Sequence, residues 1–180
     1  IYNYIEIRSQ LKTLGHKFDT DSDTEVLGKS LVEWGDSALS KLEGMWSFAW
    51  FDEDSGELLL SRDRFGEKPL YKWETEDGIF FGSEIKAIAN LIGKWPSINK
   101  DHIYRYLING YKSLYKVDST FYEEISEIKA GYCLKVNNKL EKKSYQYWDP
   151  NRKINNELTY DQAVENIRES LINSVKLRLR

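Results

Sequence analysis

Two hairpin patterns in direct succession constrain the fold of this chain more than any other feature. The strand-like segments are MWSFAWFD (45–52), ELLLSRD (57–63), PLYKWET (69–75) and GIFFGSE (78–84). Acidic residues, with Ser55 and Gly56 in the first case, fill the turns at 53–56 and 76–77. Apolar runs bounded by such turns are typical of β-hairpins. We predict two antiparallel hairpins that are neighbours in one sheet. Because their strands carry few polar positions, both faces of the sheet are expected to be covered.

Helical patterns flank the hairpins. Helices are predicted over residues 3–14, 22–34, 37–42 and 99–109, with another starting at Ser83. The pairs Asn3/Glu6 and Ser22/Glu25 have the spacing of a capping box, in which each side chain bonds the other residue's backbone N–H. A short strand is expected at 16–19, and further strands between 120 and 148 with a turn at Asn137-Asn138. Helices combined with antiparallel hairpins predict an α+β fold or a stacked αββα arrangement.

The composition of the chain argues against several classes of binding partner. The chain has 180 residues and a net charge of −3, and its basic residues are scattered. This distribution argues against a nucleic-acid partner and against a basic membrane face. The single cysteine, Cys133, excludes an internal disulfide and fits a reducing compartment. No apolar run approaches the roughly 20 residues that span a bilayer.

The chain divides into three stretches. Residues 149–158 are polar, contain Pro150 and are interpreted as a linker. Thr159, with Gln162 in capping-box position, opens an amphipathic helix that is still running at Arg180. Since the first residue is Ile1 rather than methionine, we interpret the chain as an internal fragment: a domain at 1–148, the linker, and the start of a second domain at 159–180.

A run of charge, Arg62-Asp63-Arg64, comes directly off the second strand and is followed by Phe65-Gly66. From the pattern alone, charges at a strand end mark the rim where water begins. Alternation along an extended chain places Arg62 and Arg64 on one side and Asp63 on the other. Gly66 indicates a backbone position with positive φ, and Pro69 fixes the return path. We therefore predict a rigid corner.

Five segments in this order and at these spacings resemble the glutaminase domain of glutamine-hydrolysing asparagine synthetases. They are IYNYIEIR, DTDSDTEVL, LEGMWSFAWFD, LLLSRDRFGEKPLY and FGSEIKAI. Related amidotransferases of surface-polysaccharide synthesis look similar. The resemblance covers residues 1–148, and the tail from Thr159 resembles the first helix of the family's α/β synthetase domain. It implies an incomplete αββα sandwich of the N-terminal-nucleophile hydrolase type.

The resemblance also implies an activity. Glutamine is hydrolysed to glutamate and ammonia by an N-terminal cysteine. The ammonia then amidates an aspartate activated by ATP and Mg²⁺, giving asparagine and AMP. By the resemblance, the nucleophile precedes Ile1 and the ATP-binding loop follows Arg180. We therefore expect no catalytic residue, cofactor or turnover in the fragment itself. Cys133 lies within a strand pattern and is interpreted as a small core residue.

The resemblance assigns one substrate contact. Asp23 matches the aspartate that binds the α-amino group of glutamine, whereas the pattern alone favours a carboxylate that complements the helix dipole. Thr24 is expected to line the pocket. Arg62 and Asp63 are expected to be structural anchors of the corner. His16 and His102 have no companions at metal-ligand spacing, so we predict no metal site and interpret both as solvated surface residues.

Three functions stay open at this stage. The first is part of an asparagine synthetase with glutamine and aspartate as substrates. The second is a related amidotransferase that amidates another carboxylate, such as a sugar acid. The third is a truncated module that binds glutamine or a partner without turnover. The expected location is the cytoplasm, without nucleic-acid or membrane partners, and a homodimer is left open.

Overall fold

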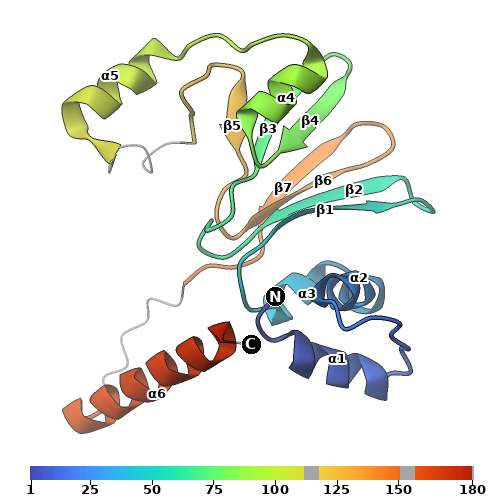
Figure 1. Ribbon diagram of the computed structural model, residues 1–180, viewed down its shortest axis with the longest axis vertical. Helices are drawn as coiled ribbons and strands as arrows, with labels where there is room; N and C mark the ends of the chain where they lie inside the picture. Colours follow the sequence, from blue (N-terminus) through green and yellow to red (C-terminus); the bar gives the residue numbers. More distant parts are fainter. Residues whose placement is uncertain (112–117, 151–156, 180) are drawn as a thin grey trace. The chain divides into compact units, whose positions relative to one another are not determined.

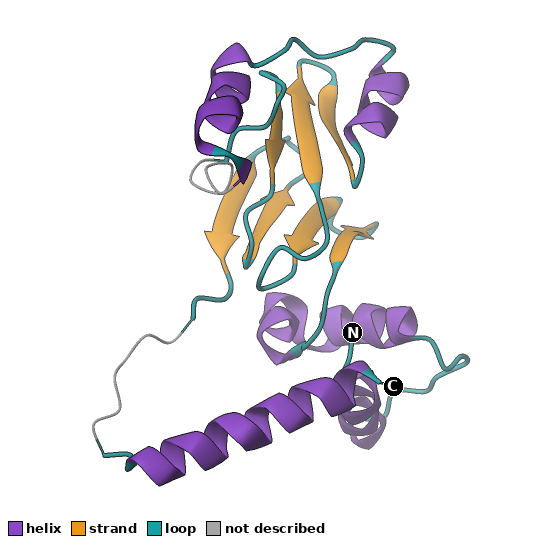
Figure 2. Cartoon of the chain, turned by 60° about the vertical axis from the view of Figure 1, so that its left-hand side comes forward, coloured by secondary structure: helices purple, strands orange, loops and turns teal. Residues whose placement is uncertain are grey.

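The computed structural model describes residues 1–111, 118–150 and 157–179. The chain divides into two compact units, one formed by Ile1–Gly44 with Asp149–Arg180 and the other by Met45–Trp148. In the described ranges the strands all belong to the second unit, and the first unit is built from helices (Figure 2).

Two antiparallel sheets form the second unit (Figure 1). The four-stranded sheet has the order β1 (Ser47–Asp52), β2 (Glu57–Arg62), β6 (Tyr132–Val136) and β7 (Lys142–Gln146). The three-stranded sheet has the order β4 (Gly78–Gly82), β3 (Tyr71–Thr75) and β5 (Ile125–Glu127). Both predicted hairpins are confirmed, since β1 pairs with β2 and β3 pairs with β4 in antiparallel register.

The prediction that the two hairpins share one sheet is wrong. The second edge of β2 pairs with β6, and the second edge of β3 pairs with β5. Strands distant in the sequence therefore complete each sheet, and residues 63–70 carry the chain from one sheet to the other. A sequence pattern identifies the local partner of a strand but not the partner on its other edge, which explains the error.

The two sheets pack face to face through a shared apolar core. Leu60 and Leu134 from the four-stranded sheet lie in one buried cluster with Leu70 and Ile128, and β4 packs Ile79 and Phe81 against this cluster. On the other face of the three-stranded sheet, α4 (Ile85–Ile92) packs against β3 and β5 through a second cluster. The expectation that both sheet faces are covered is thus confirmed for the three-stranded sheet.

The predicted helices are also present. They are α1 (Tyr4–Thr13), α2 (Asp23–Trp34), α3 (Ala38–Lys41), α5 (Lys100–Asn109) and α6 (Tyr160–Arg178). A short 3-10 helix that was not predicted, η1 (Gly35–Ser37), connects α2 to α3. The Asn99 side chain caps α5 by accepting the His102 N–H at 2.9 Å, as its sequence position predicts. The Thr159/Gln162 capping box of α6 is formed. Most of the predicted linker, residues 151–156, lies outside the described residues.

Two local predictions for the N-terminal helices fail. No strand forms at residues 16–19. The Asn3 side chain does not cap α1; instead its amide donates to the Lys41 carbonyl at 2.9 Å and its oxygen accepts the Glu43 N–H at 2.9 Å. Asn3 therefore ties the start of α1 to the end of α3. A contact some 40 residues away in the sequence has displaced the local cap, and no local spacing could reveal it.

Asp63 organises the corner after β2. Its side chain is completely buried, and its two oxygens accept four backbone N–H groups. Oδ1 accepts from Phe65 at 3.1 Å and Glu67 at 3.0 Å, while Oδ2 accepts from Lys68 at 2.9 Å and Trp46 at 3.3 Å. A carboxylate holding several N–H groups forms strong, charge-assisted hydrogen bonds. One side chain thereby fixes both the turn and the start of the first hairpin.

Arg62 binds the same corner from the other side. Its guanidinium donates to the carbonyls of Lys68 at 2.8 Å, Gly66 at 2.9 Å and Ile128 at 2.8 Å. It also forms an ion pair with Glu127 at 2.7 Å. Gly66 has φ of +67°, as predicted, and a Cβ atom there would lie 3.1 Å from the Arg62 guanidinium carbon. The contacts of Arg62 thus link the corner to β5.

Tyr147 also contacts this corner. Its hydroxyl donates to the Arg62 carbonyl at 2.7 Å, and its ring stacks on Trp46 with centroids 6.1 Å apart. Burial, and then the negative charge of Asp63, raise the pKa of the Tyr147 phenol. The hydroxyl therefore keeps its proton, and its donor role, across the neutral pH range.

The interpretation of the two histidines as solvated surface residues is corrected by their burial. Only 3% of His102 is exposed, Nδ1 lies 3.0 Å from the Ser119 hydroxyl, and the ring meets Phe121 edge-on at 4.9 Å. His16 is partly buried, and its Nε2 lies 2.7 Å from a Glu33 carboxylate oxygen. In both cases the partner comes from a segment distant in the sequence, so metal-ligand spacing alone was a poor guide to exposure.

Removing the Asp63 carboxylate is expected to destabilise the second unit strongly. Asp63→Ala leaves four backbone N–H groups without their acceptor. Because an unsatisfied buried group costs about 1–3 kcal/mol, we expect the free energy of unfolding to fall by more than about 3 kcal/mol in urea denaturation. The control is Asp77→Ala in the exposed β3–β4 turn, which should change it by less than about 0.5 kcal/mol. Equal effects of the two substitutions would contradict the anchoring role.

Acidification is expected to destabilise the packing around His102. Burial, followed by the positive charge of Arg105, lowers the pKa of His102 from 6.5, and the charge of Glu127 opposes this. A lowered folded-state pKa means that stability is fully present above pH 6.5 and declines as the pH falls through the folded pKa. Between pH 7.5 and 5, the wild type should lose more stability than His102→Phe in paired urea titrations. A larger loss in the variant would show that the sign is wrong.

Candidate functional site

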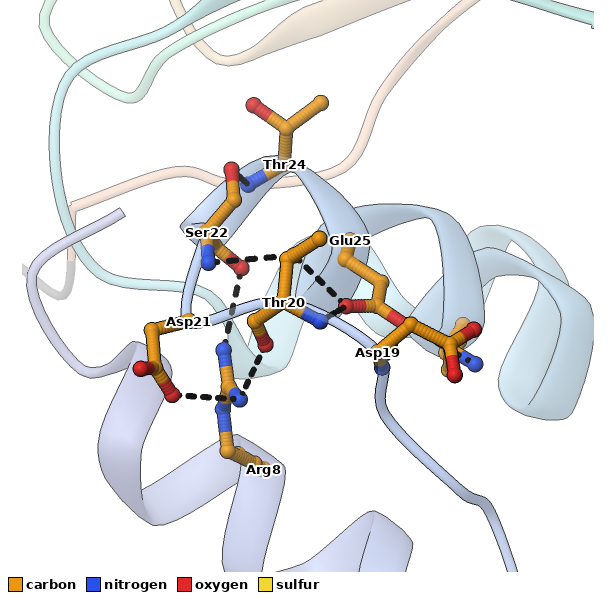
Figure 3. Close-up of polar contacts among 8 residues, drawn as sticks. Arg8, Asp19, Thr20, Asp21, Ser22, Thr24 and Glu25 are labelled. Carbon is orange, nitrogen blue, oxygen red and sulfur yellow. Dashed lines mark hydrogen bonds and ion pairs between the residues drawn. The ribbon is translucent and has the colours of Figure 1, made fainter.

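The loop that enters α2 presents the candidate site (Figure 3). Ser22 is the N-cap, with φ −68° and ψ 139°, and its hydroxyl accepts the Thr24 N–H at 3.1 Å. Asp23 is the first helical residue. A carboxylate in the first turn interacts favourably with the positive end of the helix dipole. The cap at Ser22 therefore places the Asp23 carboxylate in the first turn of α2.

The Asp23 carboxylate binds an α-ammonium group. Its Oδ2 atom lies 2.6 Å from the α-amino nitrogen of Ile1, and the Asp23 side chain is 46% exposed. The Asp23 carboxylate is accessible at the start of α2.

Arg8, from α1, holds the loop on one side. Nη1 donates to the Thr20 carbonyl at 2.6 Å and lies 3.4 Å from an Asp21 carboxylate oxygen. Nη2 donates to the Ser22 carbonyl at 3.2 Å. Figure 3 shows the guanidinium beneath the loop with its contacts directed at these residues. A planar guanidinium offers several donors in a fixed arrangement, so it can bind two carbonyls at once.

Glu25, from the first turn of α2, holds the loop on the other side. Its carboxylate accepts the backbone N–H of Asp19 at 3.0 Å, the N–H of Thr20 at 2.8 Å and the Thr20 hydroxyl at 2.7 Å. Lys29 pairs with it at 3.0 Å. The Thr20 hydroxyl, followed by the Asp19 N–H, lowers the pKa of Glu25 to about 2. The carboxylate is therefore ionised at any physiological pH.

The predicted Ser22/Glu25 capping box is not formed. Ser22 caps the Thr24 N–H, while its own N–H donates to the Thr20 hydroxyl at 3.3 Å. Glu25 is occupied by the preceding loop instead of by Ser22. The Asp19 and Thr20 N–H groups both donate to the Glu25 carboxylate. These two hydrogen bonds take the place of the one that Glu25 would accept from the Ser22 N–H in a capping box.

The site residues predicted from the sequence fall into two groups. Asp23 and Thr24 are consecutive on this loop, and the exposed Thr24 side chain points away from Arg8 and Glu25 (Figure 3). Arg62 and Asp63 belong to the other compact unit, where their contacts are with the corner backbone, Glu127 and Tyr147. Cys133 is fully buried in β6.

Sequence reasoning missed Arg8 and the actual role of Glu25. Arg8 reaches residues 12 to 14 positions away across a turn, which no helical or capping spacing encodes. Among the described residues, no group of three or more His, Cys, Asp or Glu side chains is placed to hold a metal ion. Nor does any helix in the described ranges combine the length and apolar character needed to cross a bilayer.

Comparison with known proteins decides the family. Residues 1–148 match the family model described as a glutamine amidotransferase domain. The chain belongs to this family. A putative asparagine synthetase (glutamine-hydrolyzing) 2 of Methanocaldococcus jannaschii is 32% identical over 187 residues, covering 100% of this chain and 34% of the relative. Asparagine synthetase 2 of Bacillus subtilis is 32% identical over 183 residues, covering 97% and 24%. Asparagine synthetase 3 of the same organism is 42% identical over 88 residues, covering 49% and 14%.

This amidotransferase-family chain therefore spans about a third or less of the length of these relatives. Among solved structures, the glutamine phosphoribosylpyrophosphate amidotransferase of B. subtilis matches 86% of this chain and 28% of its own, with a TM-score of 0.56 and 22% identity. At this identity the likeness concerns the fold alone. It supports the predicted fold class, in which helices accompany two stacked antiparallel sheets.

Protonation of Glu25 is expected to loosen the loop of this amidotransferase domain at low pH. Its folded-state pKa of about 2 lies below the ordinary 4.5, so its stabilising effect is complete above pH 4.5 and is lost as the pH falls toward 2. Amide exchange at residues 19 and 20, followed by NMR, should accelerate over this range after correction for intrinsic rates. In Glu25→Gln the corrected acceleration should largely disappear, and an unchanged pH profile in that variant would exclude the mechanism.

Proposed function

We propose that this chain is the glutamine-binding part of a glutamine-dependent asparagine synthetase. In this proposal glutamine is hydrolysed to glutamate and ammonia, and the ammonia amidates an ATP-activated aspartate to give asparagine and AMP. The observation that supports the proposal is the accessible Asp23 carboxylate, which is held at the first residue of α2 within an amidotransferase domain. The names of the relatives support aspartate as the acceptor.

Asp23 is proposed to receive the α-ammonium of glutamine. A carboxylate and an ammonium form a charge-assisted hydrogen bond that is roughly twice as strong as a neutral one. The carboxylate is held at the first residue of α2, and therefore little conformational freedom is lost when the ligand binds. Thr24, the next residue, is exposed on the same turn and is proposed to line the pocket beside it.

The remaining partners follow from this proposal. ATP and Mg²⁺ are proposed to supply the adenylation chemistry of the synthetase part. Glutamine, aspartate and ATP are cytoplasmic metabolites, and a lone buried thiol fits a reducing compartment, so the cytoplasm is the proposed location. Arg62 and Asp63 are proposed to act only by holding the corner.

Asp23→Asn is expected to weaken the binding of L-glutamine about tenfold or more. The substitution removes the negative charge, and a hydrogen bond to a charged group contributes about 1.5–3 kcal/mol. NMR titration with L-glutamine measures the dissociation constant. Asp19→Asn is the matched control, because this exposed residue serves the same loop through its backbone N–H rather than its carboxylate. Equal affinities of the wild type and Asp23→Asn would refute the assignment.

A second comparison separates ammonium recognition from general binding. In this proposal glutamine competes for the Asp23 carboxylate with the amino group of Ile1, which contacts it in the 180-residue chain. Acetylation of the Ile1 amine should therefore strengthen glutamine binding in the wild type and have no such effect in Asp23→Asn. 4-Carbamoylbutanoate, which is glutamine without its α-ammonium, should bind equally to both proteins. A ligand preference that ignores the state of Ile1 would argue against Asp23 as the recognition group.

A further inference from the structure

We infer that Arg8 and Glu25 are positioning residues for the recognition of the substrate's ammonium, because together they fix the loop that presents Asp23. This inference rests on the proposed function. It adds two residues that make no contact with the Asp23 carboxylate and that act on it through the backbone. The loop between α1 and α2 contains no helix or strand at residues 16–22, and side chains hold several of its backbone groups.

Arg8 and Glu25 bind different kinds of backbone group in the loop. Glu25 binds donors of the loop, the N–H groups of Asp19 and Thr20. Arg8 binds acceptors of the loop, the carbonyls of Thr20 and Ser22. The two side chains come from different helices and meet the loop from opposite sides (Figure 3). Because Asp23 follows Ser22 directly, fixing the Ser22 carbonyl fixes the peptide plane from which Asp23 departs.

Arg8 is itself held in place. Its side chain is only 12% exposed, and its guanidinium lies over the ring of Phe18 at 4.8 Å. Lys29, the ion-pair partner of Glu25, also lies within reach of this ring, at 5.0 Å. Such cation–π contacts favour a single orientation of the guanidinium. Arg8 of α1 and Lys29 of α2 therefore both contact the ring of Phe18 in the loop between the two helices.

The placement of the Arg8 charge also matters for specificity. Its acceptors in the described part of the chain are two backbone carbonyls and the carboxylate of Asp21. Asp23 is paired with an ammonium instead. A guanidinium bound to Asp23 would compete with a ligand's ammonium, whereas one bound to the backbone leaves the carboxylate available. Arg8 thus supplies rigidity without neutralising the recognition group.

The test compares the preference for glutamine over 4-carbamoylbutanoate in purified 180-residue variants. Arg8→Met retains much of the aliphatic packing but loses both backbone contacts, and we expect it to lower this preference at least fivefold. Arg8→Lys, which has a single ammonium in place of the fork, should fall between Arg8→Met and the wild type. Glu25→Gln should lower the preference severalfold by weakening the opposite side. The matched control is Arg168→Met on the exposed face of α6, which should change nothing.

A second readout distinguishes positioning from general stability. Amide exchange at residues 19–25 should accelerate in Arg8→Met and Glu25→Gln, while exchange in the strands of the second unit stays unchanged. If the loop loosens but the ligand preference does not fall in either variant, the inference is overturned, although Asp23→Asn can still abolish the preference. If Asp23→Asn leaves the preference intact, or the wild type has none, the proposed function fails and the inference fails with it. Should Arg8→Met not fold, Arg8→Lys and Glu25→Gln decide the matter by the same criterion.

Discussion

The buried carboxylate of Asp63 is the interaction on which the rest of the structure depends. It holds four backbone N–H groups at the point where the chain leaves β2. Arg62 secures the same corner through the carbonyls that Asp63 cannot bind. Between them these two buried side chains satisfy the backbone N–H and carbonyl groups of the turn that face the protein interior. The direction of this turn sends the second hairpin into a separate sheet, and that is what makes a two-sheet core.

The carboxylates of Asp63 and Asp23 lie in contrasting surroundings. Asp63 is inaccessible and its carboxylate accepts four backbone N–H groups, so its hydrogen-bonding capacity serves the scaffold. Asp23 is about half exposed at the start of α2, so its carboxylate is accessible to a ligand. Burial, rather than residue type, separates the structural carboxylate from the one that is proposed to bind glutamine.

The loop before Asp23 is held by two side chains of opposite charge. Arg8 binds the Thr20 and Ser22 carbonyls, and Glu25 binds the Asp19 and Thr20 N–H groups. Neither side chain takes the Asp23 carboxylate. These contacts hold a segment that has no regular secondary structure.

The sequence by itself determined the local elements, because their causes are local. The turn residues defined both hairpins, Asn99 and Thr159 defined helix starts, and Gly66 indicated a left-handed backbone position. Motifs in register also indicated the family, which the match over residues 1–148 bears out. Only the tertiary structure decided which sheet each hairpin joins, that His102 is buried, and that Arg8 and Glu25 support the loop before Asp23. These features depend on partners brought together by folding, and a pattern of neighbouring residues carries no information about such distant partners.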